Sequence, residues 1–492
     1  MTALKILFDT NTFIACEDVS AERLHTNARL ATALKELALR HDSELFLLAE
    51  TEEDIREDPH VAQREATLLK WRQWKHLSRI RPRGDLLGRA GYREPLKRND
   101  RVDLAMLGAL DNIAVDLLVT EDRKLRNHAD AAGLGAQTFS ILGAIEYLKK
   151  LFGEPVVLPS VHPRSAYEIS VDDPLFESLR EDYGGFDAWW AKAAREHRDC
   201  FTIEGESEQL EALAVLKPEP NGEYGLIGSA LKICTFKVAS GAEGAKRGEL
   251  VLKAVFKYAR TLGADHIYVT VFERHVSLVS LFELFGFGTL NEHSSLGELV
   301  MVKDLRIPDE VSGYSPLEFN RLFGPSAVII ERAFVIPIQP RWHDILVPEA
   351  RLQTRFPFGE DPSGNAILKA YLSQSAITQL APGDLIVFYR SQDQRAATVI
   401  GVVEDTLRSR EPSELRRFVG SRTVYSDSAI VEMCETGNVL AILFRQDRCL
   451  ATPWRLAQLR ANKVVSAAPQ TIQQVSNEEG LTWLRQQLDA PR

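Results

Sequence analysis

Four acidic residues stand at the edges of apolar segments in the first quarter of the chain. Asp9 ends the run KILFD, Asp54 follows the run ELFLL, Asp103 lies at the start of VDLAMLGAL, and Asp122 follows LLVT. Short apolar runs that alternate with helical patterns predict a parallel α/β sheet. Because the carboxyl ends of parallel strands meet at one edge of such a sheet, we expect these carboxylates to converge. Clustered oxygen donors suit Mg²⁺ or Mn²⁺, and paired ions of this kind serve displacement at phosphorus.

Each acid taken alone also has a structural explanation, because Asp commonly caps or stabilises the first turn of a helix. The order of the motifs is more specific. FDTNTF, VDLAMLGAL and LLVTEDRKL resemble the first, third and fourth motifs of PIN-domain nucleases over residues 1–152, with the adjacent Glu53 and Asp54 in the place of the second. The resemblance implies a metal-dependent endoribonuclease. Its catalytic metal ligands would be Asp9, Asp54, Asp103 and Asp122, and Thr10, Asn11 and Thr120 would orient ligands or water.

A cationic segment lies between the second and third acids. From Lys70 to Arg101 it holds eleven Lys or Arg residues against three acids, although the whole chain has a formal net charge of −10. Basic side chains interleaved with Trp71, Trp74 and Tyr92 suit a phosphate backbone and unstacked bases. The nucleic-acid contacts predicted here are Arg72, Lys75, Arg79, Arg81 and Arg83. The alternative is a solvated amphipathic helix whose tryptophans belong to the core.

Length and composition fit several globular domains. The chain has 492 residues, of which 45% are hydrophobic and 26% are charged, and such a length corresponds to about three domains. We expect a cytoplasmic protein without a membrane segment, because no apolar run of about 18 residues and no leader sequence is apparent. The five cysteines are scattered and odd in number, so we expect reduced thiols rather than a disulfide framework.

Prolines mark the first domain boundary. GEPVVLPSVHPRSAY contains three prolines and has no helical period, so residues 153–167 are predicted to be a linker. A second change in pattern occurs near KDLRIPDEVSGYSP, and no internal repeat is apparent. The chain is therefore predicted to contain three different domains, at 1–152, 168–306 and 325–492.

The second predicted domain alternates strands and helices around a glycine-containing loop. Strand-like CFTIEG, LEALAVLK and ALKICTFKV lead into the loop ASGAEGAKRGEL, and a long helix, the strand HIYVTVF, the helix SLVSLFELFGF and the strand ELVMVK follow. Backbone amides at the start of a helix that follows such a loop form an anion site. This order of elements resembles GNAT-type N-acetyltransferases over residues 168–306, which implies a mixed α/β domain that binds acetyl-coenzyme A.

The resemblance places the cofactor's pyrophosphate at the loop. The implied cofactor-binding residues are Val238, Gly244, Lys246, Arg247, Gly248 and Glu249. Phe282 stands where the family commonly has a proton-donating Tyr, and it cannot donate a proton. An active enzyme would therefore need another acid, such as a neighbouring His or a water. His275 is a candidate by position, although a helix-entry role is the more common explanation for such a residue.

The third predicted domain is mostly β. IERAFVIPIQP, GDLIVFYRS, AATVIGVVED and VLAILFRQ are strand-like, and helical patterns are predicted at 364–380, EPSELRRFVG and ATPWRLAQLR. The order resembles the PUA-like group that includes EVE and ASCH domains, which implies a small β-barrel that reads RNA. The residues predicted to line a base-binding cleft are Tyr389, Arg390, Arg422, Tyr425, Arg445 and Trp454, and core or rim positions are the alternative.

The sequence thus predicts a metal-dependent ribonuclease with fused acetyl-CoA-binding and RNA-reading domains. Its partner would be RNA, tRNA included, and a toxin-like role extends the resemblance. Tethering a reader to a nuclease raises the local substrate concentration. One alternative is an N-acetyltransferase that acts on an amine of RNA, aminoacyl-tRNA or protein while the first domain only binds RNA. Another is an RNA-binding scaffold without catalysis. Homo-oligomerisation and a regulatory protein partner stay open.

Overall fold

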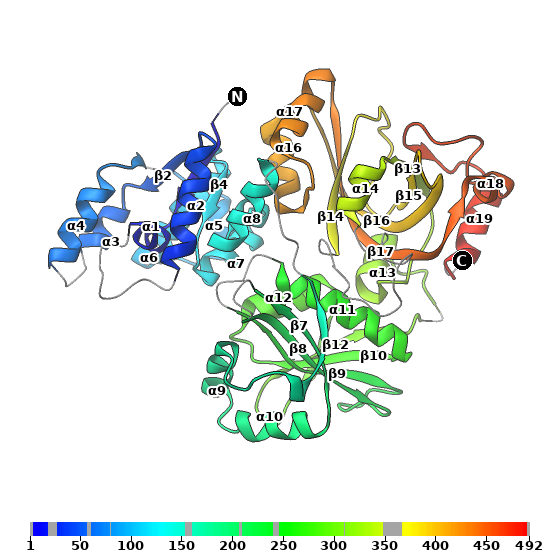
Figure 1. Ribbon diagram of the computed structural model, residues 1–492, viewed down its shortest axis with the longest axis horizontal. Helices are drawn as coiled ribbons and strands as arrows, with labels where there is room; N and C mark the ends of the chain where they lie inside the picture. Colours follow the sequence, from blue (N-terminus) through cyan, green and yellow to red (C-terminus); the bar gives the residue numbers. More distant parts are fainter. Residues whose placement is uncertain are drawn as a thin grey trace.

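The computed structural model describes residues 3–17, 27–56, 61–78, 80–152, 160–205, 209–239, 246–308, 310–347 and 367–489. These residues build three sheets of five, seven and six strands, one after another along the chain. Figure 1 shows them as a blue to cyan N-terminal domain, a green middle domain and a yellow to red C-terminal domain. The predicted multidomain α/β class is confirmed.

The N-terminal sheet is parallel throughout, with the order β3-β2-β1-β4-β5. Strand side chains alternate between its two faces, so Ile6 and Phe8 enter one apolar cluster and Leu7 enters the other. Helices supply the rest of both clusters. The strands are β1 (Lys5–Phe8), β2 (Glu44–Leu48), β3 (Lys75–Leu77), β4 (Leu117–Val119) and β5 (Thr138–Phe139). The helices are α1 (Thr10–Cys16), α2 (Ala28–Arg40), α3 (Thr51–Arg56), α4 (Val61–Trp71), α5 (Leu86–Arg89), α6 (Arg98–Asp111), α7 (Arg123–Ala131) and α8 (Ile141–Leu151).

The middle sheet is mixed, with the order β11-β12-β10-β9-β8-β7-β6. Its helices pack as the predicted pattern requires, and α11 buries an apolar stripe that includes Leu252, Val255 and Phe256. Residues 162–165, which fall in the predicted linker, form an edge strand of this sheet. The strands are β6 (His162–Ser165), β7 (Asp199–Glu204), β8 (Leu210–Glu219), β9 (Ala230–Val238), β10 (His266–Val271), β11 (Gly288–His293) and β12 (Leu299–Asp304). The helices are α9 (Glu177–Asp182), α10 (Phe186–Arg195), α11 (Arg247–Leu262) and α12 (Val276–Leu284).

The C-terminal sheet has the order β14-β17-β16-β15-β13-β18, in which only β13 and β15 pair in parallel among the described strands. The helix predicted over 364–380 is wrong for residues 368–373, which form β14. The strands are β13 (Ala333–Ile338), β14 (Leu368–Ser373), β15 (Leu385–Arg390), β16 (Ala396–Ser409), β17 (Val439–Arg455) and β18 (Gln473–Gln474). The helices are α13 (Pro316–Phe323), α14 (Pro340–Leu346), α16 (Pro412–Val419), α17 (Asp427–Thr436), α18 (Leu456–Ala461) and α19 (Glu478–Gln487).

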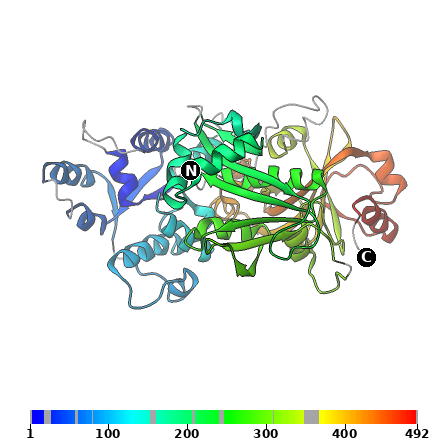
Figure 2. The same ribbon diagram turned by 90° about the horizontal axis from the view of Figure 1, so that it is seen from below.

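Polar contacts join the three domains. Arg247 of the middle domain pairs with Glu146 on α8 of the N-terminal domain at 2.6 Å. Glu249 accepts a hydrogen bond from the backbone N–H of Leu368 in the C-terminal domain at 2.7 Å. The N-terminal domain and the last two helices lie at opposite ends of the molecule (Figures 1 and 2). Among the described residues, no helix is both long and apolar enough to cross a membrane.

Candidate functional sites

Three of the four predicted metal ligands lie at the carboxyl edge of the N-terminal sheet. Asp9 directly follows β1 and caps α1, where it accepts a hydrogen bond from the backbone N–H of Thr12 at 2.6 Å. Asp122 follows β4 by three residues and caps α7, with its Oδ1 accepting from the N–H groups of Lys124 and Leu125. Asp103 lies in the second turn of α6 and accepts from the Tyr92 hydroxyl at 3.4 Å.

The three carboxylates influence one another electrostatically. Burial and the charge of Asp122 raise the pKa of Asp103 to about 6. Burial also raises the pKa of Asp9, although hydrogen bonds from Thr12 and Thr120 oppose the shift. Asp100, one turn before Asp103, is held by an ion pair with Lys124 at 2.8 Å, and this hydrogen bond lowers its pKa. Acids with like charges therefore share this edge, as a cation site requires.

The side chains as placed do not form a complete metal-ligand set. Among the described side chains, no three Asp, Glu, His or Cys residues are arranged to hold one ion. Both oxygens of Asp9 already accept hydrogen bonds, from the Thr12 N–H and from the Thr120 hydroxyl. Asp54 lies on α3, but its side chain is outside the described set. Binding of Mg²⁺ or Mn²⁺ at this edge stays a prediction.

The residues predicted to orient ligands or water include both buried and exposed side chains. Thr120 is fully buried, and its hydroxyl links two acids by donating to Asp9 and accepting from the N–H of Asp122. Thr10 and Asn11 form the start of α1, where Asn11 is exposed. The structure thus brings Thr120 into the carboxylate edge directly, and it leaves Asn11 facing solvent.

The cationic segment contributes exposed basic side chains. Arg72, Arg81 and Arg83 are exposed, and Lys75 is exposed while it pairs with Glu44. Arg79 lies outside the described residues. The tryptophans pack inward, because Trp74 contacts the rings of Phe8 and Phe13 at centroid distances of 5.4 and 5.3 Å. The core explanation therefore applies to Trp74, and contact of the basic side chains with nucleic acid stays a prediction.

The middle sheet splits between its two adjacent parallel strands. β9 pairs with β10 from Ala230↔His266 only as far as Ile233↔Val269, although β9 continues to Val238. Beyond that point β9 pairs only with β8, and β10 pairs with β12. The two parallel strands therefore part at their carboxyl ends, and α11 follows β9 on the chain at this place.

The start of α11 meets the divided edge closely. A side-chain carbon added at Gly248 would lie 3.0 Å from Leu281 Cδ2 on α12 and 3.4 Å from Val238 Cγ2 at the end of β9. Lys246 is the N-cap and its side chain makes no capping hydrogen bond. A lysine has no acceptor atom for the first amides of the helix. The first backbone N–H groups of α11 are thus not capped by the Lys246 side chain, and at Gly248 they lie close to the end of β9. A helix start of this kind can bind an anion.

Two of the predicted cofactor-binding residues have side chains that pair with other protein groups. Arg247 is buried between Glu146 and Glu211, with N–O distances of 2.6 Å to each. Glu249 is buried and contacts Leu368 N–H and Arg422 in the C-terminal domain. Gly244 lies outside the described residues. Phe282 is fully buried against Phe236 and Phe287, which agrees with its inability to act as an acid.

The predicted base-binding residues of the C-terminal domain are mostly internal. Tyr389 and Tyr425 belong to its apolar clusters. Arg390 is buried and forms ion pairs with Asp344 and Asp393. Arg422 is partly buried beside Glu249. Arg422 thus borders the middle domain, as does Arg445, which pairs with Glu404 and donates to the Leu284 carbonyl, while Trp454 is buried in an apolar cluster. A base-binding role for the set stays a prediction.

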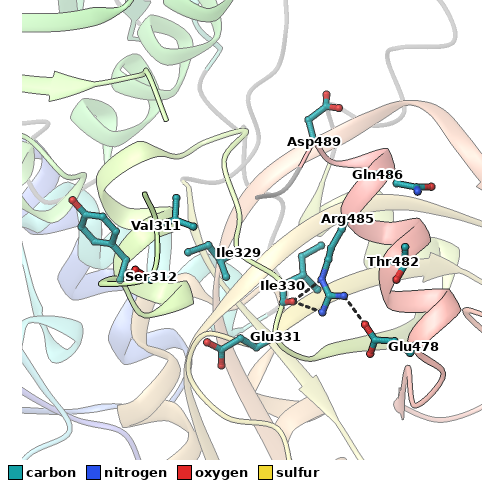
Figure 3. A pocket seen from close by; sticks show the side chains of 11 residues that line it. Val311, Ser312, Ile329, Ile330, Glu331, Glu478, Thr482, Arg485, Gln486 and Asp489 are labelled. Carbon is teal, nitrogen blue, oxygen red and sulfur yellow. Dashed lines mark hydrogen bonds and ion pairs between the residues drawn. The ribbon is translucent and has the colours of Figure 1, made fainter. Parts of the chain in front are cut away.

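A cleft in the C-terminal domain was not predicted from the sequence. It has a volume of about 770 Å³ and lies between α19 and the segment from Val311 to Glu331. Figure 3 shows Arg485 at this cleft, where it donates to the Ile330 carbonyl and pairs with Glu478. None of the predicted site residues lines it. Because the Arg485 guanidinium already contacts the Ile330 carbonyl and Glu478, the cleft offers little to an anionic ligand.

Sequence comparison identifies no relative, because no family model and no curated protein matches the chain. Solved structures match parts of it. They include ASCH from Zymomonas mobilis, which is 15% identical over 31% of this chain and 93% of that chain, with a TM-score of 0.25. A putative GNAT-family acetyltransferase from Desulfovibrio desulfuricans is 14% identical over 30% of this chain and 99% of that chain, with a TM-score of 0.24. The PaiA N-acetyltransferase from Thermoplasma acidophilum in complex with coenzyme A is 15% identical over 30% and 99%, with a TM-score of 0.23. These values are too low to assign an activity or a residue role to this chain.

Proposed function

We propose that the middle domain is an N-acyltransferase that uses acetyl-coenzyme A and acts on an amine of RNA, aminoacyl-tRNA or protein. The observation that carries this proposal is the divided sheet. Two parallel strands, β9 and β10, part beyond Ile233 and Val269, and the first residues of α11 lie beside the end of β9. The amide-containing arm of acetyl-coenzyme A can form hydrogen bonds with backbone groups along the edge where β9 and β10 have parted. The backbone N–H groups at the start of α11 suit the phosphates of this cofactor.

The residues present fit the cofactor mainly through their backbone. Gly248 leaves no obstructing side chain at the start of α11. Burial lowers the pKa of the Lys246 amine, so the backbone N–H groups carry the argument there. When bound, the cofactor supplies an acyl group activated as a thioester. The side chains of Arg247 and Glu249 hold the neighbouring domains, so they position the helix start rather than a ligand.

Binding to the full chain tests this proposal. Calorimetry with coenzyme A should give a measurable dissociation constant, and thiol release should depend on an added primary amine. Gly248→Val should weaken binding at least tenfold, because its branched side chain would meet Leu281 and Val238. Gly288→Val on β11 is the matched control, since a side-chain carbon there meets no atom within 4 Å. Absence of heat with the wild-type chain at millimolar coenzyme A would disprove the proposal.

A second function, cleavage of RNA phosphodiesters, is proposed for the carboxylate edge. The specific support is that Asp9, Asp103 and Asp122 lie at one edge, where burial and then the charge of Asp122 raise the pKa of Asp103 to about 6 and the pKa of Asp9 is raised as well. Mn²⁺ titration of the full chain and an assay on mixed cellular RNA, with and without a chelator, test it. Asp103→Asn and Asp122→Asn should each abolish cleavage, whereas full activity in both variants would exclude this site.

A further inference from the structure

Three polar contacts extend from the end of α9 to the turn after β10 and to the start of β12. Asp182, the last residue of α9, accepts from Arg274 at 2.7 Å and contacts His275 Nε2 at 3.1 Å. The next residue, Tyr183, donates to buried Glu298 at 2.6 Å. Arg274 and His275 lie in the turn between β10 and α12, and Glu298 immediately precedes β12. These residues therefore connect α9 with the place where β10 leaves β9.

His275 lies near the place where β9 and β10 part. It caps α12, whose Leu281 lies against Gly248, and it follows the end of β10 by four residues. Its charged neighbours are Asp182 on α9, Arg274 in its own turn and Lys237 near the end of β9. β10 pairs with β9 only as far as Val269, so the end of β10 that leads into His275 has already parted from β9. The His–Asp contact is therefore at the opening between the strands, and not at the far edge of the sheet.

We infer that His275 is the general base that removes a proton from the acceptor amine, and that Asp182 is the positioning residue that orients its ring. This inference rests on the proposed acyltransferase function. It assigns removal of the amine proton to His275, and it gives the resulting imidazolium the proton-donating role that Phe282, which is fully buried and has no exchangeable proton, cannot fill.

The contacts explain both roles. If Nε2 carries the proton and donates it to Asp182, Nδ1 keeps a lone pair that can accept a proton. Burial is the largest cause that lowers the pKa of His275, with Arg274 and Lys237 acting in the same direction and Asp182 opposing them. Burial would raise the pKa of Asp182, but hydrogen bonding to Arg274 and the charge of His275 outweigh it and lower that pKa. Near neutral pH the pair is thus a neutral imidazole beside a carboxylate.

The proton and electron balance of the step is simple. Nδ1 of His275 takes one proton from the acceptor's ammonium group, and the freed lone pair on nitrogen forms a bond to the acyl carbon. The carbon–sulfur bond breaks, and the thiolate leaves with its electron pair. The imidazolium returns its proton to that thiolate, so the products are an amide and a thiol, and the second amine proton passes to solvent. Asp182 stays ionised throughout.

Variants of His275 distinguish a general base from a residue that only holds the structure together. His275→Gln in the full chain should reduce kcat of amine-dependent thiol release by about 100-fold or more, as expected for loss of a general base. The dissociation constant of coenzyme A, measured by calorimetry, should change less than threefold. The acid limb of the kcat/KM profile, with an apparent pKa below about 6.5 for the wild-type chain, should disappear. His266→Gln is the matched control, because His266 contacts Asp304 at the opposite end of β10.

A second measurement does not depend on the folding of a variant. Carbethoxylation of the wild-type chain, followed residue by residue with mass spectrometry, should modify His275 at a rate that falls only below its lowered pKa. Modification at His275 should stop thiol release and leave coenzyme A binding intact, and hydroxylamine should restore turnover. Turnover that persists after His275→Gln or after carbethoxylation would overturn the base assignment alone. A wild-type chain that binds no coenzyme A would overturn the proposed function and the assignment together.

Discussion

The carboxyl of Asp103 is held in an unfavourable ionised state at the edge of the N-terminal sheet. Burial and repulsion from Asp122 raise its pKa to about 6, against an opposing effect of Lys124. A raised carboxyl pKa means that the folded chain binds a proton more tightly than the unfolded chain. The stabilisation from this group is present at low pH and is lost as pH rises through about 6. The edge therefore stores charge repulsion that a bound cation would relieve.

Asp103→Asn should accordingly stabilise the metal-free protein above pH 6. We expect a gain of about 1 kcal/mol at pH 7.5, after allowance for the partial solvent exposure of this carboxyl. The gain should vanish near pH 4, where the wild-type carboxyl is protonated. Thermal unfolding in chelator across this pH range measures it. Asp100→Asn is the control, because the hydrogen bond from Lys124 lowers the pKa of Asp100, so its removal should give no gain. Equal effects of both variants at all pH values would contradict the repulsion argument.

At the scale of elements, local patterns predicted most strands and failed in particular places. β1, β4, β9 and β10 lie where short apolar runs end in polar or glycine-containing segments. β14 was mistaken for a helix, because Leu368 to Leu372 is buried on both faces and so lacks the alternation that identifies a strand. Its flanking residues 348–366 lie outside the described set.

The candidate sites show the same limit. Asp9 and Asp122 were predictable because each lies within three residues of the end of a strand and caps the next helix. The partners of Arg247 and Glu249 were not predictable, because Glu146 and Arg422 are more than 100 residues away in sequence. Glu298 and Tyr183 were missed for the same reason, since their contact joins residues 115 positions apart. Sequence patterns report local periodicity, and they do not report which distant elements meet.

The segment between α4 and α6 offers a test of nucleic-acid binding. Arg72 and Arg81 are exposed and form no ion pair within the described residues, unlike Lys75. The double change Arg72→Glu, Arg81→Glu should weaken RNA binding and reduce the slope of log affinity against log salt by about 1.4, or 0.7 for each lost phosphate contact. Filter binding between about 50 and 200 mM salt would measure this slope. Lys192→Glu, Arg195→Glu on α10 makes the same charge change elsewhere, and equal losses in both double variants would indicate a nonspecific effect of net charge.

For the whole molecule, the start of α11 is where the three domains meet. Arg247 pairs with Glu146 of the N-terminal domain, and Glu249 contacts Leu368 and Arg422 of the C-terminal domain. A second contact, between Ala136 and Gly420, joins the outer domains directly; a side-chain carbon at Gly420 would lie only 2.4 Å from the Ala136 carbonyl oxygen. The proposed cofactor site therefore shares its helix with the contacts that fix the domains, so movement of either outer domain would be transmitted to it.

Removing Arg247 should uncouple the domains. Arg247→Met leaves Glu146 and Glu211 without their shared cation, and loss of one partner of a buried pair costs about 3 kcal/mol or more. We expect the wild-type chain to unfold in one thermal transition and the Arg247→Met variant in two, with the N-terminal domain unfolding apart from the rest. Arg164→Met is the control, because Arg164 pairs with Glu204 at an exposed position of the same domain. A double-mutant cycle with Glu146→Gln should give a coupling energy above about 1 kcal/mol, as contacting residues do. If Arg247→Met unfolds in one transition at the wild-type temperature, the α11 junction does not hold the domains together.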